Sequence, residues 1–227
     1  MIAAVLVFLS VMASAGASAA FAAQPPAGRE DSAAADAIVA ELRDLPLPLE
    51  AFPRGIASRE ATQRPLPALE QRRQRVYDEL HALGPASVPA LARALRDPDA
   101  DMRRDVLIAL DVLGGGWWQF PGGGAKLDIR PALPALVSAL GDSDSGVRAW
   151  AAEDIGDIGA AAVPPLRVIL HSQDATARAS ACSALGKLGA GAGEALPELR
   201  QALSDPSPDV RQAARRAIGS IAAPPAP

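Results

Sequence analysis

The sequence predicts an all-α protein, a solenoid of about four stacked helix pairs plus a degenerate N-terminal unit. Two observations carry this prediction. Aromatic residues make up only 4% of the 227 residues and alanine is abundant, so the composition favours closely packed helices over strands, which pack with aromatic and β-branched side chains. In addition, a proline-led motif recurs along the chain at intervals that suit a helix pair.

The first 23 residues are predicted to be a signal peptide. Residues 2–11 form an uncharged, mostly apolar run, and residues 20–22 read Ala-Phe-Ala, the pattern that precedes signal-peptidase cleavage. The alternative is that the segment is retained as an anchor, because no Lys or Arg precedes the apolar run. Cleavage predicts an exported bacterial protein, periplasmic or secreted, with no membrane span in the mature chain.

Residues 24–70 are predicted to form an alanine- and proline-rich segment with one short helix, over residues 31–45. Its apolar residues fall on one side, and the sequence leaves open whether the segment packs on the solenoid or tethers it. The first helix of the degenerate unit is expected around residues 56–69, where prolines predict an irregular helix or a loop.

The solenoid is predicted over residues 71–222. In each unit a proline begins the first helix, where it costs no intrahelical hydrogen bond, and an acidic turn then ends that helix and caps the second one. Apolar residues three, seven and ten positions after a recurrent arginine form the core stripe of the second helix. The prolines are Pro89, Pro134, Pro164 and Pro197, and the arginines are Arg103, Arg148, Arg178 and Arg211.

Two further sets of residues recur with the same spacing. Glycines are predicted to end the second helices in a left-handed conformation, at Gly84, Gly114, Gly159 and Gly189. The recurrent arginines are expected to bond the acidic turns or the carbonyl groups at helix ends, which is a structural role and not that of a basic binding surface.

The Val-Pro-Ala-Leu motif, the acidic turn, the Val-Arg pair and the closing Ala-Leu-Gly pattern together resemble the HEAT-repeat family, in particular its short bilin-lyase-like subgroup, over residues 71–222. The resemblance implies a right-handed, armadillo-type solenoid of antiparallel helix pairs, each of which buries its stripe on its neighbours. In such solenoids the second helices usually line the concave side, which implies a scaffold for protein binding.

The candidate binding residues therefore lie opposite the core stripe, at positions two, five, six and nine after each arginine. One such row combines a tryptophan with three carboxylates, which could anchor a basic or amphipathic peptide. The alternative is that the tryptophan packs against a neighbouring helix and that the acids form an ordinary solvated face. This row is Trp150, Glu153, Asp154 and Asp157.

A second candidate is an inserted Gly/Trp loop, residues 114–130, which lengthens one interval between repeats. Its aromatic residues, Trp117, Trp118 and Phe120, are costly to leave in water. Two hypotheses stay open, that the loop inserts these rings into a partner and that it folds back over a groove between repeats. The tail, residues 223–227, is predicted to be disordered.

The sequence predicts no enzyme, no cofactor and no metal site. His81 and His171 have no second ligand at zinc spacing, and no phosphate-binding loop or nucleophile elbow is present. A formal net charge of −4 argues against a nucleic-acid partner. The predicted function is an exported scaffold that binds a protein or peptide through its concave face and the aromatic loop.

The resemblance also implies an alternative function, an accessory or lyase-like protein that handles a chromophore or a modifying enzyme subunit. Export counts against this alternative, because that chemistry is cytosolic. A DNA-handling enzyme of the alkylpurine-glycosylase type, whose fold is also HEAT-like, is disfavoured by the negative charge and the signal peptide.

Overall fold

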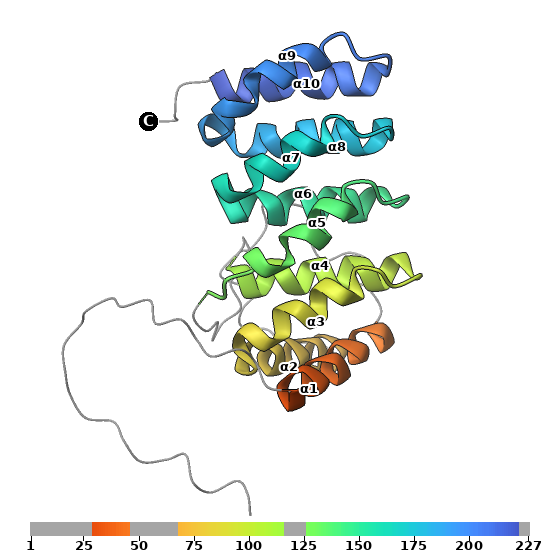
Figure 1. The fold of residues 1–227 in the computed structure, drawn as a ribbon. Helices are drawn as coiled ribbons and strands as arrows, with labels where there is room; N and C mark the ends of the chain where they lie inside the picture. The colour runs from red at the N-terminus through yellow and green to blue at the C-terminus, as the bar shows by residue number, and fades with distance from the viewer. Residues whose placement is uncertain (1–28, 46–67, 116–125, 223–227) are drawn as a thin grey trace, which may run out of the picture.

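The computed structural model describes residues 29–45, 68–115 and 126–222, and the regular structure in these ranges is entirely helical. The helices stack into one column of antiparallel pairs (Figure 1), which confirms the predicted all-α solenoid. In the described residues no helix is long and apolar enough to span a membrane. The predicted signal peptide, the aromatic residues of the inserted loop and the tail at residues 223–227 lie outside the described residues.

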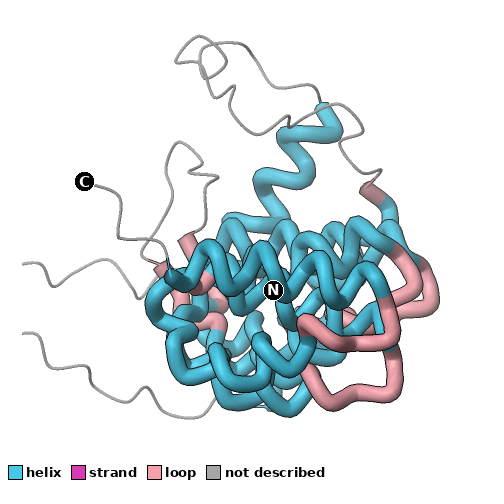
Figure 2. The backbone as a smooth tube through the Cα atoms, turned by 90° about the horizontal axis from the view of Figure 1, so that it is seen from above, coloured by secondary structure: helices cyan, strands magenta, loops and turns pink. Residues whose placement is uncertain are grey.

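The four predicted helix pairs form two layers. The second helices contact one another in the order α4, α6, α8 and α10, and each also packs on the first helix of its own pair. Seen along the stack, the turns that join the two helices of a pair gather at one edge (Figure 2). The pairs are α3 (Ser87–Ala94) with α4 (Ala100–Gly114), α5 (Leu133–Ala139) with α6 (Ser145–Ile158), α7 (Val163–Ile169) with α8 (Ala175–Lys187), and α9 (Leu196–Ala202) with α10 (Pro208–Ala222).

The helix starts follow the predicted signals. The recurrent prolines occupy the first turn of α3, α5, α7 and α9, where a backbone N–H would have no partner within the helix. Asp99, Asp144 and Asp174 cap α4, α6 and α8, each accepting a backbone N–H bond of 2.8–2.9 Å from the first turn of its helix. Short 3-10 turns, which the sequence did not predict, lead into each first helix. They are η3 (Gly84–Ala86), η4 (Arg130–Ala132), η5 (Gly159–Ala162) and η6 (Gly189–Ala195).

Three of the four predicted glycine helix ends are confirmed. Gly84, Gly159 and Gly189 have φ of +60°, +79° and +55°, which favours glycine. Gly159 ends its helix with ψ of −149°, so it lies outside the left-handed helical region that was predicted. The prediction for Gly114 is wrong by one residue, because Gly114 is still helical and Gly115 has φ +73°. A Cβ at Gly114 would lie 3.0 Å from the Ile129 side chain, so this glycine instead lets Ile129 pack closely against α4.

The predicted stripe forms the core. Residues three positions after each arginine are buried, and those seven and ten positions after it are buried or pack against the core from its edge. Each large member contributes about 1.5–3 kcal/mol through burial. The stripe comprises Val106, Leu110, Leu113, Ala151, Ile155, Ile158, Ala181, Leu185, Leu188, Ala214, Ile218 and Ile221.

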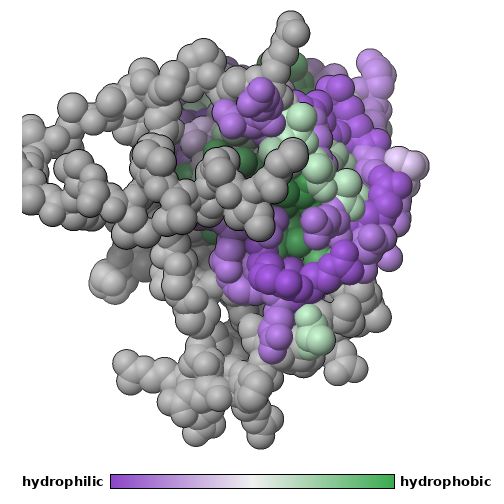
Figure 3. Space-filling view, turned by 90° about the horizontal axis from the view of Figure 1, so that it is seen from below, coloured by the Kyte–Doolittle hydropathy of each residue, from purple (hydrophilic) through white to green (hydrophobic). Residues whose placement is uncertain are grey.

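The N-terminal end of the stack is built from two segments that are distant in sequence. Helix α1 (Arg29–Glu41), followed by the 3-10 turn η1 (Leu42–Asp44), packs on α2 (Ala68–Ala82) and on α3, and Arg93 bonds Asp36 at 2.6 Å. Residues 29–45 therefore pack on the solenoid, and α1 takes the place of a first helix. The irregular helix expected around residues 56–69 lies mostly outside the described residues, and α2 already begins at Ala68. From this end, hydrophobic residues are visible inside a ring of hydrophilic ones (Figure 3).

Candidate binding groove

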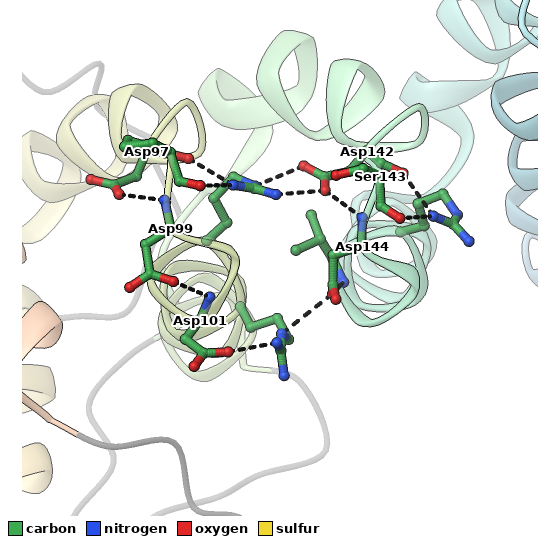
Figure 4. A network of polar contacts seen from close by, with 11 residues as sticks. Asp97, Asp99, Asp101, Asp142, Ser143 and Asp144 are labelled. Carbon is green, nitrogen blue, oxygen red and sulfur yellow. Dashed lines mark hydrogen bonds and ion pairs between the residues drawn. The ribbon is translucent and has the colours of Figure 1, made fainter.

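Each recurrent arginine holds the acidic turn that precedes its own helix. One Nη1 group donates to the two backbone carbonyls at the start of the turn, at 2.7–3.1 Å, in all four repeats. Figure 4 shows this network at the first two turns, where Asp97, Asp99 and Asp101 face Asp142, Ser143 and Asp144. The prediction of a structural role for these arginines is confirmed.

Two of the arginines also reach into the next repeat, a contact that the sequence did not predict. Arg103 donates to Asp142 through Nε and Nη2, both at 2.7 Å, and Arg178 donates to Asp205 through the same groups, both at 2.8 Å. The bonds from Arg178 hold the pKa of Asp205 below its usual value. For Asp142, burial has the largest effect and raises the pKa, but the Arg103 bonds, the bond from the Asp144 backbone N–H and the charges of Arg103 and Arg148 together lower it below its usual value. The pairs clamp consecutive repeats together.

Arg148 lacks such a carboxylate. The position that Asp142 and Asp205 occupy in their repeats is taken by Ser172 in the repeat after Arg148. Arg148 keeps its Nη1 bonds to the turn carbonyls, at 2.7 and 3.0 Å, but its Nε and Nη2 groups have no hydrogen-bond partner among the described residues. Arg211, in the last of the four repeats, likewise bonds its turn carbonyls through Nη1 and has no carboxylate partner among the described residues.

An open groove of about 510 Å³ runs over the second helices α6, α8 and α10. Small side chains form much of its lining, including Ala149, Ala152, Ala179, Ser180, Ser183 and Ala213. Its charged lining residues are Arg148, Glu153, Lys187, Asp209 and Arg216, of which Glu153 and Lys187 form an ion pair with each other. The second helices predicted to carry a binding surface therefore do form a groove in three consecutive repeats.

The residues predicted to bind a partner lie in different environments. Glu153 lines the groove, and Asp157 is exposed. Trp150 is half-buried and packs against the hydrophobic core, the arrangement described by the alternative hypothesis for this residue. Trp117, Trp118 and Phe120 lie outside the described residues, so both hypotheses for the inserted loop stay open.

The prediction that Asp154 faces a partner is wrong, because its side chain is 0% exposed. Position six after the arginine turns toward the adjacent second helix, and the other repeats place a buried alanine there. These alanines are Ala109, Ala184 and Ala217. Consecutive residues on a helix point about 100° apart, so position six lies at the edge of the predicted face nearest the core stripe. The sequence alone does not show that the adjacent second helix covers this edge.

A second buried carboxyl accompanies Asp154 at the interface between α4 and α6. Asp111, 2% exposed, stands eight positions after its arginine, where the other three repeats have glycine. Burial raises the pKa of Asp111 to about 6, with repulsion by Asp157 adding to it and Lys126 opposing it. Burial also raises the pKa of Asp154 well above its usual value, and Asp111 and Asp157 raise it further. Within the described ranges neither oxygen of Asp154 has a hydrogen-bond partner.

The Cys182 side chain is buried in the core. Burial raises the pKa of the Cys182 thiol to about 12, so this residue is an inert core side chain and not a thiolate. In the ranges the structure describes, no three His, Cys, Asp or Glu side chains are grouped so that they could hold a metal ion.

The architecture is that of a helical-repeat solenoid with a groove over its second helices, and comparison with known proteins identifies the repeat. The model of HEAT repeats matches residues 124–186 and 163–227, so the repeats in this part of the chain are HEAT repeats, as the motif resemblance predicted. No curated protein matches the sequence.

Several solved structures are similar in arrangement. A designed armadillo repeat protein in complex with the peptide (KR)4 has 19% identity over 83% of this chain and 82% of its own, with a TM-score of 0.41. The complex of CpcE and CpcF of phycocyanin lyase from Nostoc sp. has 24% identity over 77% of this chain and 68% of the matched chain, with a TM-score of 0.39. These TM-scores are too low for either structure to inform what this chain binds.

Proposed function

We propose that the protein is an exported HEAT-repeat scaffold, without catalytic activity, that binds a protein or peptide partner in the groove over α6, α8 and α10. The observation that carries this proposal is the groove itself, which spans three consecutive second helices and is lined largely by Ala and Ser side chains. Small side chains leave room for a second chain to approach the helices closely, and the groove is open to solvent.

The size of the groove suits a peptide segment. Packed helices lie 8–10 Å apart, so three of them span roughly 20 Å. An extended chain rises about 3.3 Å per residue, which gives room for about six residues. The inserted loop is a proposed second contact, through Trp117, Trp118 and Phe120, because large aromatic side chains supply much of the binding energy in protein interfaces. Export rests on the apolar segment at residues 2–11 and the cleavage pattern that follows it.

Filling the groove tests the proposal. Ser183 is exposed on the groove lining, so Ser183→Trp places a large side chain in the binding region without disturbing the core. Val168 on α7 is 70% exposed and outside the groove, which makes Val168→Trp a matched control. A partner captured by the wild-type chain is identified, purified and titrated against all three proteins. Binding at least roughly tenfold weaker for Ser183→Trp alone is expected, and equal binding by both variants would refute the groove as the site.

A triple change of Trp117, Trp118 and Phe120 to Ser tests the loop with the same purified partner. Weaker binding with an unchanged melting temperature is expected if the loop contacts the partner. A lower melting temperature with unchanged binding would instead assign the loop to the fold. N-terminal sequencing of the expressed protein tests export, and a mature chain that begins at Met1 would contradict it.

A further inference from the structure

We propose that Arg148 forms a carboxylate-binding subsite in this groove, and that the groove therefore takes an acidic peptide segment, whose Asp or Glu side chain bonds the Nε and Nη2 groups of Arg148. The inference rests on the proposed function and adds the charge of the partner.

The first support is the geometry of the equivalent arginines. Arg103 and Arg178 hold their own turns through Nη1, as Arg148 does, and each uses Nε and Nη2 to bind a side-chain carboxylate with two bonds of 2.7–2.8 Å. The same side chain in the same structural position thus binds a carboxylate twice in this molecule. A planar guanidinium edge suits a carboxylate in just this bidentate manner.

The second support is the reason why Arg148 is left open. Ser172 stands where the next repeat would supply an aspartate, and its hydroxyl already accepts a bond from the backbone N–H of Asp174 at 3.2 Å. Arg148 lines the groove, so a bound chain can reach the edge that an internal aspartate occupies elsewhere. Asp142 and Asp205 show that a side-chain carboxylate fits such an edge, which favours an internal Asp or Glu of the partner over a chain terminus.

The third support is the balance of charge in the groove. Lys187 and Glu153 compensate each other, and Arg216 and Asp209 form no ion pair within the described residues. Arg148 also forms no ion pair in those residues, although its charge lowers the pKa of Asp142, so the groove lining carries two cations outside ion pairs against one such anion. The chain as a whole, by contrast, has a net charge of −4. This reverses the basic partner expected from the row of acids around Trp150, because Asp154 is buried and Glu153 is paired.

Short labelled peptides test the inference on the full mature chain by fluorescence anisotropy. The probe is acetyl-Glu-Ala-Ser-Ala-Ser-Ala-Glu-amide, and the comparison peptides carry Gln or Lys in place of both Glu residues. A fourth peptide has Gln in place of Glu and a free C-terminal carboxylate. We expect the Glu peptide to bind at least roughly tenfold more tightly than the other three.

Three variants connect this preference to Arg148. Arg148→Gln removes the subsite, and Ser172→Asp fills it from within the molecule, so both are expected to weaken binding of the Glu peptide by roughly tenfold or more. Ser172→Asp is also expected to raise the melting temperature, a change that loss of folding would not produce. Arg211→Gln is the matched control, since Arg211 makes the same carbonyl bonds outside the groove, and should bind the peptide like the wild type.

Several results would overturn the inference. These are tighter binding of the Lys peptide, equal binding of the Gln peptide or of the peptide with a free C-terminus, undiminished binding by Arg148→Gln, or no binding of any peptide. The proposed function is judged separately by Ser183→Trp with the purified partner. If Ser183→Trp weakens that complex while the Arg148 results fail, the groove remains the site and only the acidic character of the partner is refuted.

Discussion

Two interfaces between second helices occupy equivalent places in the stack and are built differently. Between α8 and α10, Gly186 faces Ala217 so closely that a Cβ on the glycine would lie 3.0 Å from the Ala217 Cα. Between α4 and α6, the corresponding positions carry Asp111 and Asp154, both buried. The repeat pattern therefore tolerates two solutions, a close contact of small residues and an interface that buries two carboxyl groups. The second should cost stability, since buried carboxyl groups without partners are unfavourable.

The largest expected effect comes from blocking the close contact. Gly186→Val should destabilise the fold by about 3–4 kcal/mol, because the new side chain meets backbone atoms of α10 that cannot move aside without shifting the helix. Chemical denaturation measures the loss. Gly219→Val is the matched control, since nothing lies within 4 Å of a Cβ there, and its cost should be limited to helix propensity. Equal losses in the two variants would mean that α8 and α10 do not approach closely.

The next effect is a pH dependence that the α4/α6 interface should show. The folded-state pKa of Asp111, about 6, lies above the ordinary aspartate value of 3.8, so its contribution to stability is fully present below about pH 3.8 and is lost as the pH rises through about 6. The loss corresponds to about 3 kcal/mol. Burial gives Asp105 a pKa of about 7 and a contribution of the same sign, which Arg73 reduces.

The carboxylate that joins α8 to the last repeat should respond in the opposite sense. Bonds from Arg178 lower the pKa of Asp205, so its contribution is present above pH 3.8 and is lost as the pH falls through the lower, folded-state pKa. Unfolding free energies measured between pH 3 and 8 should thus fall toward neutral pH in the wild type and fall less in Asp111→Asn. A wild-type profile that rises steadily to pH 8 would contradict the two buried carboxyl groups.

A smaller effect is expected from making the two interfaces alike. Asp154→Ala installs the residue that the other repeats have at this position and removes a buried carboxyl group without a partner in the described residues. The variant should be about 2 kcal/mol more stable at pH 7. Thermal denaturation checks this against Asp157→Ala, an exposed change on the same helix that should have little effect. Destabilisation by Asp154→Ala would show that the carboxyl group has a favourable partner.

The smallest expected effect is the difference in stability between variants of Arg178 and Arg148. Arg178→Gln loses the turn bonds and the pair with Asp205, whereas Arg148→Gln loses the turn bonds alone. The first variant should be less stable than the second by about 1 kcal/mol, measured by the shift of the denaturation midpoint. A difference near zero would mean that the bidentate pair of Arg178 and Asp205 makes no net contribution to the stability of the fold.

Most of the fold could be predicted from the sequence, because the features that build a helix pair are local. Pro134 at a helix start, Asp144 as a cap and Ile155 in the stripe each act within a few residues of their own position. The role of α1 was not predictable in this way. It packs on α2 and α3 through contacts that are distant in sequence, and no internal repeat marks it as a first helix.

The candidate site was predicted only in part. The second helices do form the groove, but spacing placed Asp154 on the surface and gave no sign that Glu153 would pair with Lys187 on the next helix. Two signals were present in the aligned repeats, Ser172 in place of an aspartate and Asp111 in place of a glycine. The structural effect of each substitution depends on which helix lies opposite it, so it could be inferred only once the stacking order of the helices was known.

At the N-terminal end of the stack, α1 packs on α2 and α3 although these helices are distant from it in sequence, and this distance affects the order of folding. The pairs from α3–α4 to α9–α10 each join helices that follow one another directly in sequence, so their contacts close short loops. Joining α1 to α2 and α3 instead requires a much longer excursion of the chain, with a larger entropic cost before any contact is gained. Folding should therefore begin among the local pairs, and α1 should be the last helix to dock and the first to detach.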